Sequence, residues 1–272
     1  AWDPTDAGPQ PRGKQANAAP LLLRPVFYTP ASGIWQSVWL ELVPVTHVAS
    51  LRLTPRGDAL HVCAAVAGAR GGERLRVAAV VEGERFCLAE GDAGRELVLE
   101  VPEPRRWSPD DPFLYDLDVQ LLRDGEPIDR ATSYFGLRDV QVRRDVRGAL
   151  RVHLNGAPVL LHGLLDQGYW PDGIFTAPSD EALRFDLEET RRLGFNLVRK
   201  HVKVEPARWY WHCDRLGLLV IQDMPSGDRI TPGLAIGGIG PFDASRWLGK
   251  KGIRRTPGSK AIFERELDAM IA

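Results

Sequence analysis

Apolar and polar residues alternate along much of the first half of the chain, from about residue 45 to 143. Four runs have the period of two that buries one face of a strand, and their apolar positions are Leu60, Val62, Ala64 and Val66; Leu75, Val77, Ala79 and Val81; Leu97, Leu99 and Val101; and Leu117, Val119 and Leu121. Glycine-containing breaks separate the runs at strand-sized intervals. The pattern predicts an antiparallel β-sandwich of immunoglobulin-like type over residues 45–145, without a catalytic cluster of its own.

Near residue 150 the pattern changes to short apolar runs that alternate with amphipathic segments. We expect buried strands at 159–161, 196–199 and 218–221. One helix is expected between the first two strands, with a Ser179 or Asp180 cap and an end at Gly194. A second is expected to open at Pro206 and stop at Gly217. Strands that are apolar on both faces and alternate with helices indicate a parallel sheet with right-handed crossovers.

The last part of the chain is rich in glycine and then becomes amphipathic again. Eight glycines between residues 225 and 258 predict a long loop, and 237–240 lacks the preceding strand and following helix of a phosphate site. A final helix is expected over 259–272, with an apolar face made of Ile262, Phe263, Leu267, Met270 and Ile271.

Charge and composition narrow the class of partner. Lys and Arg total 35 and Asp and Glu 36, scattered along the chain, and the formal net charge is −1. This balance argues against nucleic acid and anionic membrane and favours a neutral substrate. No apolar run approaches the roughly 20 residues of a membrane helix. The three cysteines are odd in number and lack C-x-x-C spacing, so neither a disulfide framework nor a zinc site is expected.

Four motifs in the second half carry the functional information. The first runs from Leu154-Asn155-Gly156 to Gly163, and the second is Asp166-Gln167-Gly168-Tyr169-Trp170-Pro171-Asp172-Gly173. The third is Asn196-Leu197-Val198-Arg199-Lys200-His201, and the fourth is Cys213-Asp214-Arg215-Leu216-Gly217-Leu218-Leu219-Val220. Together they resemble glycoside hydrolase family 2, the group of β-galactosidases, β-glucuronidases and β-mannosidases.

The resemblance covers nearly the whole chain and implies an order of domains. Residues 1–44 would be the last strands of a jelly-roll sugar-binding domain, with Ser32-Gly33-Ile34-Trp35 as its recognisable motif. Residues 45–145 would be the immunoglobulin-like sandwich, and 146–272 the first part of a (β/α)8 barrel. The implied activity is that of a retaining exo-β-glycosidase, first of all a β-galactosidase, with a β-linked sugar as partner, no cofactor and a homo-oligomer possible.

The reactive face of such a barrel lies at the carboxyl ends of its strands. Polar and aromatic residues that follow the three expected strands are therefore the candidate substrate contacts: Asp166, Gln167, Trp170, Arg199, Lys200, His201 and Asp223. Trp170 fits both a stacking platform and an apolar plug, and His201 fits both a sugar contact and a packing role. Lys200 and Lys203 would suit the carboxylate of a glucuronide, which is the runner-up substrate.

The catalytic carboxylates themselves are not among these residues. In the family, the acid/base Glu follows an Asn at the end of strand four and the nucleophile Glu comes from strand seven, whereas this chain has no Asn-Glu dipeptide. We therefore expect both to lie beyond the C-terminus, leaving the 272-residue chain inactive. Without the resemblance, Asp166 and Asp223 would be the natural pair, since a glycosidase needs two carboxylates. The alternative of another class is a non-catalytic carbohydrate-binding or scaffold module.

Overall fold

The computed structural model describes residues 10, 11, 13, 14, 28, 29, 31, 33–225 and 256–271. The chain divides into two compact units. One comprises Trp39–His162 and Cys213–Leu219, and the other comprises Ala1–Val38, Gly163–His212 and Val220–Ala272. Most of the regular structure is β-sheet, with few helices. Because most of residues 1–33 and 226–255 fall outside the described part, so do the jelly-roll motif's Ser32 and most of the predicted loop at 225–258.

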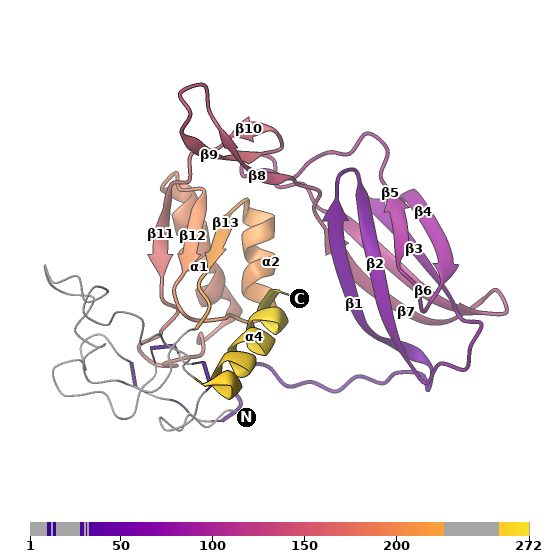
Figure 1. The fold of residues 1–272 in the computed structure, drawn as a ribbon. Coiled ribbons are helices and arrows are strands. Elements are labelled where there is room, and N and C mark those ends of the chain that lie inside the picture. The colour runs from indigo at the N-terminus through magenta and orange to yellow at the C-terminus, as the bar shows by residue number, and fades with distance from the viewer. Residues whose placement is uncertain are drawn as a thin grey trace, which may run out of the picture. The chain divides into compact units, whose positions relative to one another are not determined.

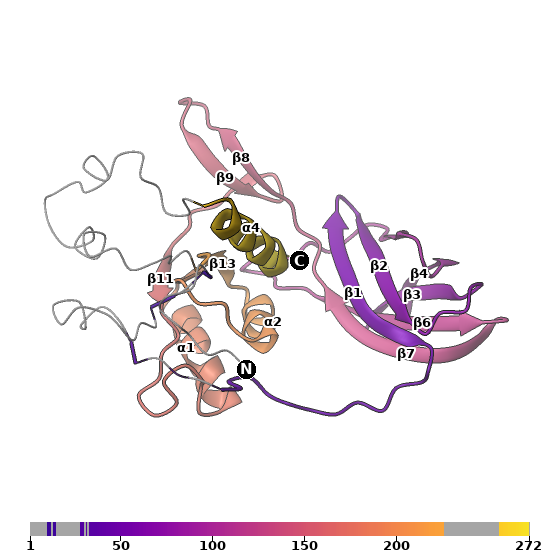
Figure 2. The ribbon, with the colours of Figure 1, turned by 60° about the horizontal axis from the view of Figure 1, so that its bottom comes forward.

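The larger β-structure consists of two antiparallel sheets that face each other (Figures 1 and 2). In the first sheet the order is β1 (His47–Arg56), β2 (Ala59–Ala67) and β5 (Leu97–Glu100). In the second the order is β4 (Glu84–Asp92), β3 (Arg74–Val81), β6 (Tyr115–Arg123) and β7 (Glu126–Phe135). The two-residue turns after β3 and β6 pair a residue at positive φ, Glu82 or Asp124, with a glycine. Such turns match the twist of a hairpin.

The apolar positions of the alternating pattern form the core between these sheets. Ten of them are at most 1% exposed: Leu60, Val62, Leu75, Val77, Ala79, Leu99, Val101, Leu117, Val119 and Leu121. They come from both sheets, so each strand buries one face against the opposite sheet. The predicted antiparallel sandwich is therefore confirmed, and its core belongs to a single unit of the chain.

Truncating a core valine should test this arrangement. We expect Val77→Ala to lower the free energy of unfolding by about 2 kcal/mol, because it removes two buried methyl groups and leaves a cavity. Urea denaturation of the 272-residue chain, followed by circular dichroism, measures the change. The matched control is Val142→Ala, because Val142 is 65% exposed, and it should shift the midpoint only slightly. Equal shifts for the two variants would contradict the assigned core.

After the sandwich, a separate three-stranded antiparallel sheet contains β8 (Val140–Arg144), β9 (Leu150–Leu154) and β10 (Ala157–Pro158). The predicted buried strand at 159–161 is wrong. These residues lie outside any strand, and Leu160 is 79% exposed. The strand that does enter the parallel sheet begins four residues later, at Gly163. An apolar run alone could not distinguish the two positions.

The second unit holds a parallel sheet with helices. Its strands, in spatial order, are β11 (Gly163–Asp166), β12 (Leu197–Lys200) and β13 (Leu219–Gln222). β11 and β12 are parallel, with Gly163 paired with Leu197 and Asp166 with Lys200. The helix α1 (Asp180–Arg192) connects them, and α2 (Ala207–Leu216) follows β12. The predicted strands at 196–199 and 218–221 are confirmed with one-residue shifts.

The helix boundaries follow their predicted capping residues. Ser179 caps α1 by accepting a hydrogen bond from the Ala182 amide, and Gly194 follows α1 at φ +86°. Gly217, at φ +72°, stands directly after α2. The last helix, α4, spans Pro257–Ile271 and confirms the helix expected over 259–272, although Ile271 is 73% exposed.

Candidate functional site

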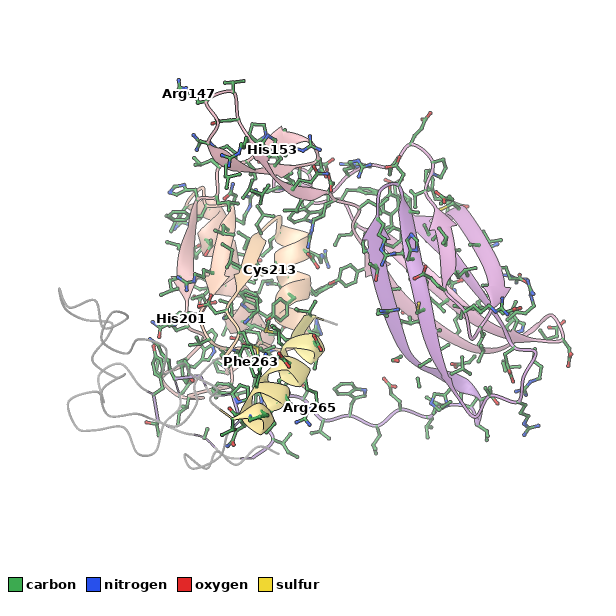
Figure 3. All side chains as sticks on the ribbon, in the orientation of Figure 1. Arg147, His153, His201, Cys213, Phe263 and Arg265 are labelled. Atoms are coloured by element: carbon green, nitrogen blue, oxygen red, sulfur yellow. The ribbon has the colours of Figure 1, made fainter. Side chains whose placement is uncertain are left out.

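The carboxyl ends of the three parallel strands meet at one edge of the sheet. The His201 amide donates to the carbonyl of Asp166 at 2.8 Å, and the Asp223 amide donates to the carbonyl of Lys200 at 3.0 Å. Figure 3 labels His201 at this edge, directly after β12. The structure therefore brings the ends of all three strands together, as the sequence predicts for the mouth of a parallel sheet.

Arg199 and Asp223 form the exposed polar pair of this edge. The guanidinium donates to both carboxylate oxygens, Nε to Oδ1 at 3.0 Å and Nη2 to Oδ2 at 2.9 Å. Such a bidentate pair fixes both side chains in one plane. Because both oxygens of Asp223 accept from Arg199, the carboxylate is engaged as an ion-pair partner. That geometry suits orientation of neighbouring groups better than delivery of a proton.

His201 lies beside this pair, with Nε2 4.0 Å from Oδ2 of Asp223. Its Nδ1 is buried and has no hydrogen-bond partner among the described residues. Burial lowers the pKa of His201, and the positive charge of Lys14 lowers it further, while Asp223 acts in the opposite direction. The imidazole is therefore held neutral more readily than a solvent-exposed one, so it can accept as well as donate a hydrogen bond.

Asp166 ends β11 and is held on both carboxylate oxygens. Its Oδ2 accepts from the Lys200 ammonium at 2.7 Å, and its Oδ1 accepts from the Gly168 amide at 2.7 Å. The side chain is 24% exposed. Asp166 and Asp223 thus each accept hydrogen bonds from a cationic side chain, Asp166 from Lys200 and Asp223 from Arg199.

Lys200 does not reach the open face. It is 0% exposed, donates to Glu205 at 2.8 Å as well as to Asp166, and lies 4.4 Å from the ring centroid of Trp209. The structure does not support the predicted substrate contact of Lys200, because its ammonium is already paired inside the protein. In the four-residue strand β12 Arg199 is exposed, whereas Lys200 is buried like Leu197 and Val198.

Lys203 and Glu205 complete a buried cluster of four charges with Asp166 and Lys200. Oε1 of Glu205 accepts from both ammonium groups, at 2.8 Å from Lys200 and 3.0 Å from Lys203. Glu205 is 5% and Lys203 2% exposed. Burial lowers the pKa of Lys203, and Glu205 opposes that shift. Two cations and two anions in contact satisfy one another, which is the condition for burying them.

The charged cluster packs directly against the backbone of Gly168, where a side chain would not fit. Its backbone has φ +65°, and a Cβ at this position would lie 2.2 Å from Oε1 of Glu205, 2.9 Å from Cδ of Lys203 and 3.0 Å from Nζ of Lys200. Two separate reasons therefore require glycine here: the left-handed backbone conformation and the close approach of the Glu205 carboxylate.

The segment near the N-terminus adds two side chains that the sequence did not predict. The ammonium of Lys14 donates to Oε1 of Gln167 at 2.7 Å, and the hydroxyl of Tyr28 donates to the same oxygen at 2.9 Å. The ring of Tyr28 stacks on Tyr169 with centroids 3.7 Å apart. These contacts join residues about 140 to 150 positions apart, which no local pattern could reveal.

Trp170 lies in a tight turn of the loop that follows β11. It exchanges backbone hydrogen bonds with Ile174, at 2.8 and 3.0 Å. The neighbouring rings form an edge-to-face series, with Phe175 4.6 Å from Trp35 and 5.6 Å from Tyr169. The turn therefore fixes the backbone of Trp170 within a loop whose other aromatic residues, Tyr169 and Phe175, contact each other.

A cavity of about 360 Å³ adjoins Asp166 and Gln167. Its walls include Leu165, Tyr28, Tyr169 and Asp186. Burial raises the pKa of Asp186, and the negative charge of Asp166 raises it further. The walls thus combine polar groups with leucine and tyrosine side chains, a mixture typical of small-molecule pockets. Within the described residues, no group of three His, Cys, Asp or Glu side chains could hold a metal ion.

Removal of the Lys14 charge should be visible at His201. Because Lys14 lowers the pKa of His201, Lys14→Met should raise it, although burial keeps it below 6.5. NMR titration of the imidazole measures this shift, and Lys260→Met, on the exposed face of α4, is the control that should leave it unchanged. Since the folded pKa lies below that of the unfolded chain, His201 destabilises the fold as pH falls below about 6.5. That loss should be smaller in Lys14→Met.

The amino-acid sequence was compared with protein-family models and with characterised proteins, and both comparisons lead to the same family. Residues 47–138 match the model of the glycosyl hydrolases family 2. A β-galactosidase of Aeromonas hydrophila is 35% identical over 213 residues, which cover 71% of this chain and 20% of that protein. A β-galactosidase of Thermoanaerobacter pseudethanolicus is 26% identical over 218 residues, covering 75% and 29%.

Solved structures show a similar fold. A β-glycosidase from Bacteroides vulgatus superimposes with a TM-score of 0.64 at 22% identity, covering 73% of this chain and 26% of that one. An FMN-binding β-glucuronidase from Facaelibacterium prausnitzii L2-6 gives 0.60 at 21% identity, covering 68% and 30%. The chain thus spans between a fifth and a third of the length of these proteins. No helix in the part of the chain that the structure describes is long and apolar enough to cross a membrane.

Proposed function

Because the chain belongs to glycoside hydrolase family 2, we propose that it is part of a retaining exo-β-glycosidase that removes terminal β-linked sugars, with β-galactosides as its first substrates. The observation that carries the proposal is the convergence of Gln167, His201 and the Arg199–Asp223 pair at one edge of the parallel sheet. These groups supply the donors and acceptors that sugar hydroxyls need.

The domain assignment is part of the same proposal. Residues 1–44 are the end of a jelly-roll domain, 45–145 an immunoglobulin-like sandwich, and 146–272 the first part of a (β/α)8 barrel. The order β11-β12-β13 supports the last assignment, because consecutive strands of a barrel are neighbours. Contacts from Lys14 and Tyr28 to Gln167 support a shared site between the first and third segments.

In this mechanism the chain binds the sugar while two glutamates from elsewhere in the full-length protein perform the chemistry. One attacks the anomeric carbon to form a glycosyl-enzyme, and the other protonates the leaving oxygen and then activates water. Arg199, fixed by Asp223, and the neutral imidazole of His201 would hold hydroxyls of the ring. Trp170 would offer an apolar face beside them.

A glucuronide is the second candidate. Lys200 and Lys203, which suggested it in the sequence, are buried and paired. Lys14 instead places a cation beside Gln167 and close enough to His201 to alter its pKa. A carboxylate on the sugar would find a partner there.

Kinetics of the full-length protein on nitrophenyl β-galactoside, β-glucuronide and β-mannoside test the proposal. We expect the highest kcat/KM on the galactoside. A preference for the glucuronide that Lys14→Met abolishes would favour the second candidate. Absence of turnover on all three would reject the hydrolase and leave a carbohydrate-binding or scaffold module.

A further inference from the structure

The loop between β11 and α1 carries Gln167, Tyr169 and Trp170, and one ammonium group holds it at two points. Nζ of Lys203 donates to the carbonyl of Gly168 and, at 2.8 Å, to the carbonyl of Phe175. The two carbonyls are seven residues apart in the sequence. The Lys203 ammonium therefore bridges the two ends of the segment that contains Tyr169 and Trp170. Lys203 itself follows β12.

Aromatic rings surround the same ammonium. Its distance to the ring centroid is 4.5 Å for Phe175, 5.6 Å for Trp35 and 5.7 Å for Tyr169. A cation is attracted to the faces of such rings when it is shielded from water, and Lys203 is 2% exposed. Tyr169 and Phe175 belong to the loop, so the Lys203 ammonium contacts side chains of the loop as well as its backbone.

Lys203 is itself fixed from the other side. Oε1 of Glu205 accepts from its ammonium at 3.0 Å, and Nε2 of Gln222, at the end of β13, donates to its backbone carbonyl at 2.9 Å. Lys203 therefore connects the loop, which its ammonium holds, to the end of β13, which holds its backbone. Rigid support of this kind is what keeps binding groups in a productive geometry.

The donors of Lys203 are fully used. An ammonium has three N–H groups, and three acceptors surround this one: the carbonyls of Gly168 and Phe175 and the carboxylate of Glu205. No donor is left for a substrate, so any influence of Lys203 on sugar binding has to pass through the loop.

We propose that Lys203, held by Glu205, is a positioning residue that fixes the β11–α1 loop and thereby places Gln167 and Trp170 for the sugar. This role rests on the proposed function, because the loop residues would be the sugar contacts. A shift of about 1 Å in such contacts is enough to weaken binding severely. The groups that perform the chemistry lie elsewhere, so the effect should fall on KM rather than on kcat.

The test compares Lys203→Met with Lys260→Met in the full-length protein. Both changes remove an ammonium and keep a flexible chain, but Lys260 is on the exposed face of α4. For Lys203→Met we expect KM on the best nitrophenyl glycoside to rise tenfold or more, with kcat within about twofold. Hydrogen exchange should become faster for amides 168–176 and stay unchanged in the sandwich strands. Lys260→Met should behave as wild type in both measurements.

A second pair guards against a variant that fails to fold. Glu205→Gln keeps the shape and both lysines but removes the charge that holds Lys203, and Glu264→Gln is its exposed counterpart on α4. Glu205→Gln should raise KM in the same direction, by a smaller factor, with faster exchange in the same loop.

Two results would overturn the proposal. Either the loop amides exchange at the wild-type rate without the ammonium, or they exchange faster while KM is unchanged. If the full-length protein hydrolyses none of the glycosides, the proposed function fails, and sugar binding by calorimetry replaces KM. Equal affinity of Lys203→Met and wild type would then reject the positioning role on its own.

Discussion

Replacing Gly168 by Ala is expected to break the packing around β11 and β12, with a loss of about 4 kcal/mol or more in the local free energy of opening. The new Cβ would stand 2.2 Å from the Glu205 carboxylate, far inside contact distance. That carboxylate cannot retreat without leaving two buried ammonium groups uncompensated. Hydrogen exchange of the β12 amides in the 272-residue chain measures the effect.

Gly57→Ala is the matched control. Gly57 has φ +60°, close to the +65° of Gly168, but a Cβ there would meet no atom within 4 Å. In the exchange of the adjoining β1 and β2 amides it should therefore show only the cost of the left-handed backbone, roughly 1 to 2 kcal/mol. If the two substitutions had equal effects, the clash with Glu205 would be refuted and Gly168 would be only a turn glycine.

Lys200→Met is the other substitution with a large expected effect. It leaves two carboxylates, Asp166 and Glu205, with Lys203 as the remaining cation of the cluster. Breaking a buried ion pair by removing one partner typically costs 3–5 kcal/mol, so we expect a loss of about 3 to 5 kcal/mol in the same exchange measurement, somewhat reduced because Asp166 is partly exposed.

The double variant Lys200→Met/Asp166→Asn separates charge from packing. It restores neutrality, keeps the Lys203–Glu205 pair, and leaves an amide oxygen that can still accept from the Gly168 amide. We expect it to recover much of the loss, as coupled partners do in a double-mutant cycle. A double variant less stable than Lys200→Met alone would mean that the charges do not act as a pair.

The sequence predicted the elements whose signals are local. Alternation located the sandwich core, and Ser179, Gly194 and Gly217 marked helix ends because capping chemistry depends on a few adjacent residues. The strand ends then followed, and with them Asp166, His201 and Asp223 at one edge. A period of two or of 3.6 residues is a physical consequence of burying one face, so it survives in the sequence alone.

The missed features depend on contacts that sequence periodicity does not encode. The strand at 159–161 was placed too early, whereas Gly163 permits the close backbone approach to Leu197, where a Cβ would lie 2.2 Å from its carbonyl oxygen. Glu205 stands in a loop before Pro206, and only its distant partners show that it is buried. Lys14 and Tyr28 reach Gln167 from the other end of the chain.

The buried charge cluster should make the parallel sheet less sensitive to high salt concentration than the sandwich. Asp166, Lys200, Lys203 and Glu205 carry no net charge together, and three of them are almost inaccessible to solvent, so dissolved ions have little room to come between them. Exposed pairs such as Arg74–Glu90 on the sandwich are screened over a Debye length of about 3 Å at 1 M salt. As ionic strength rises, the sandwich surface should lose part of its electrostatic stabilisation, while the mouth of the parallel sheet keeps its shape.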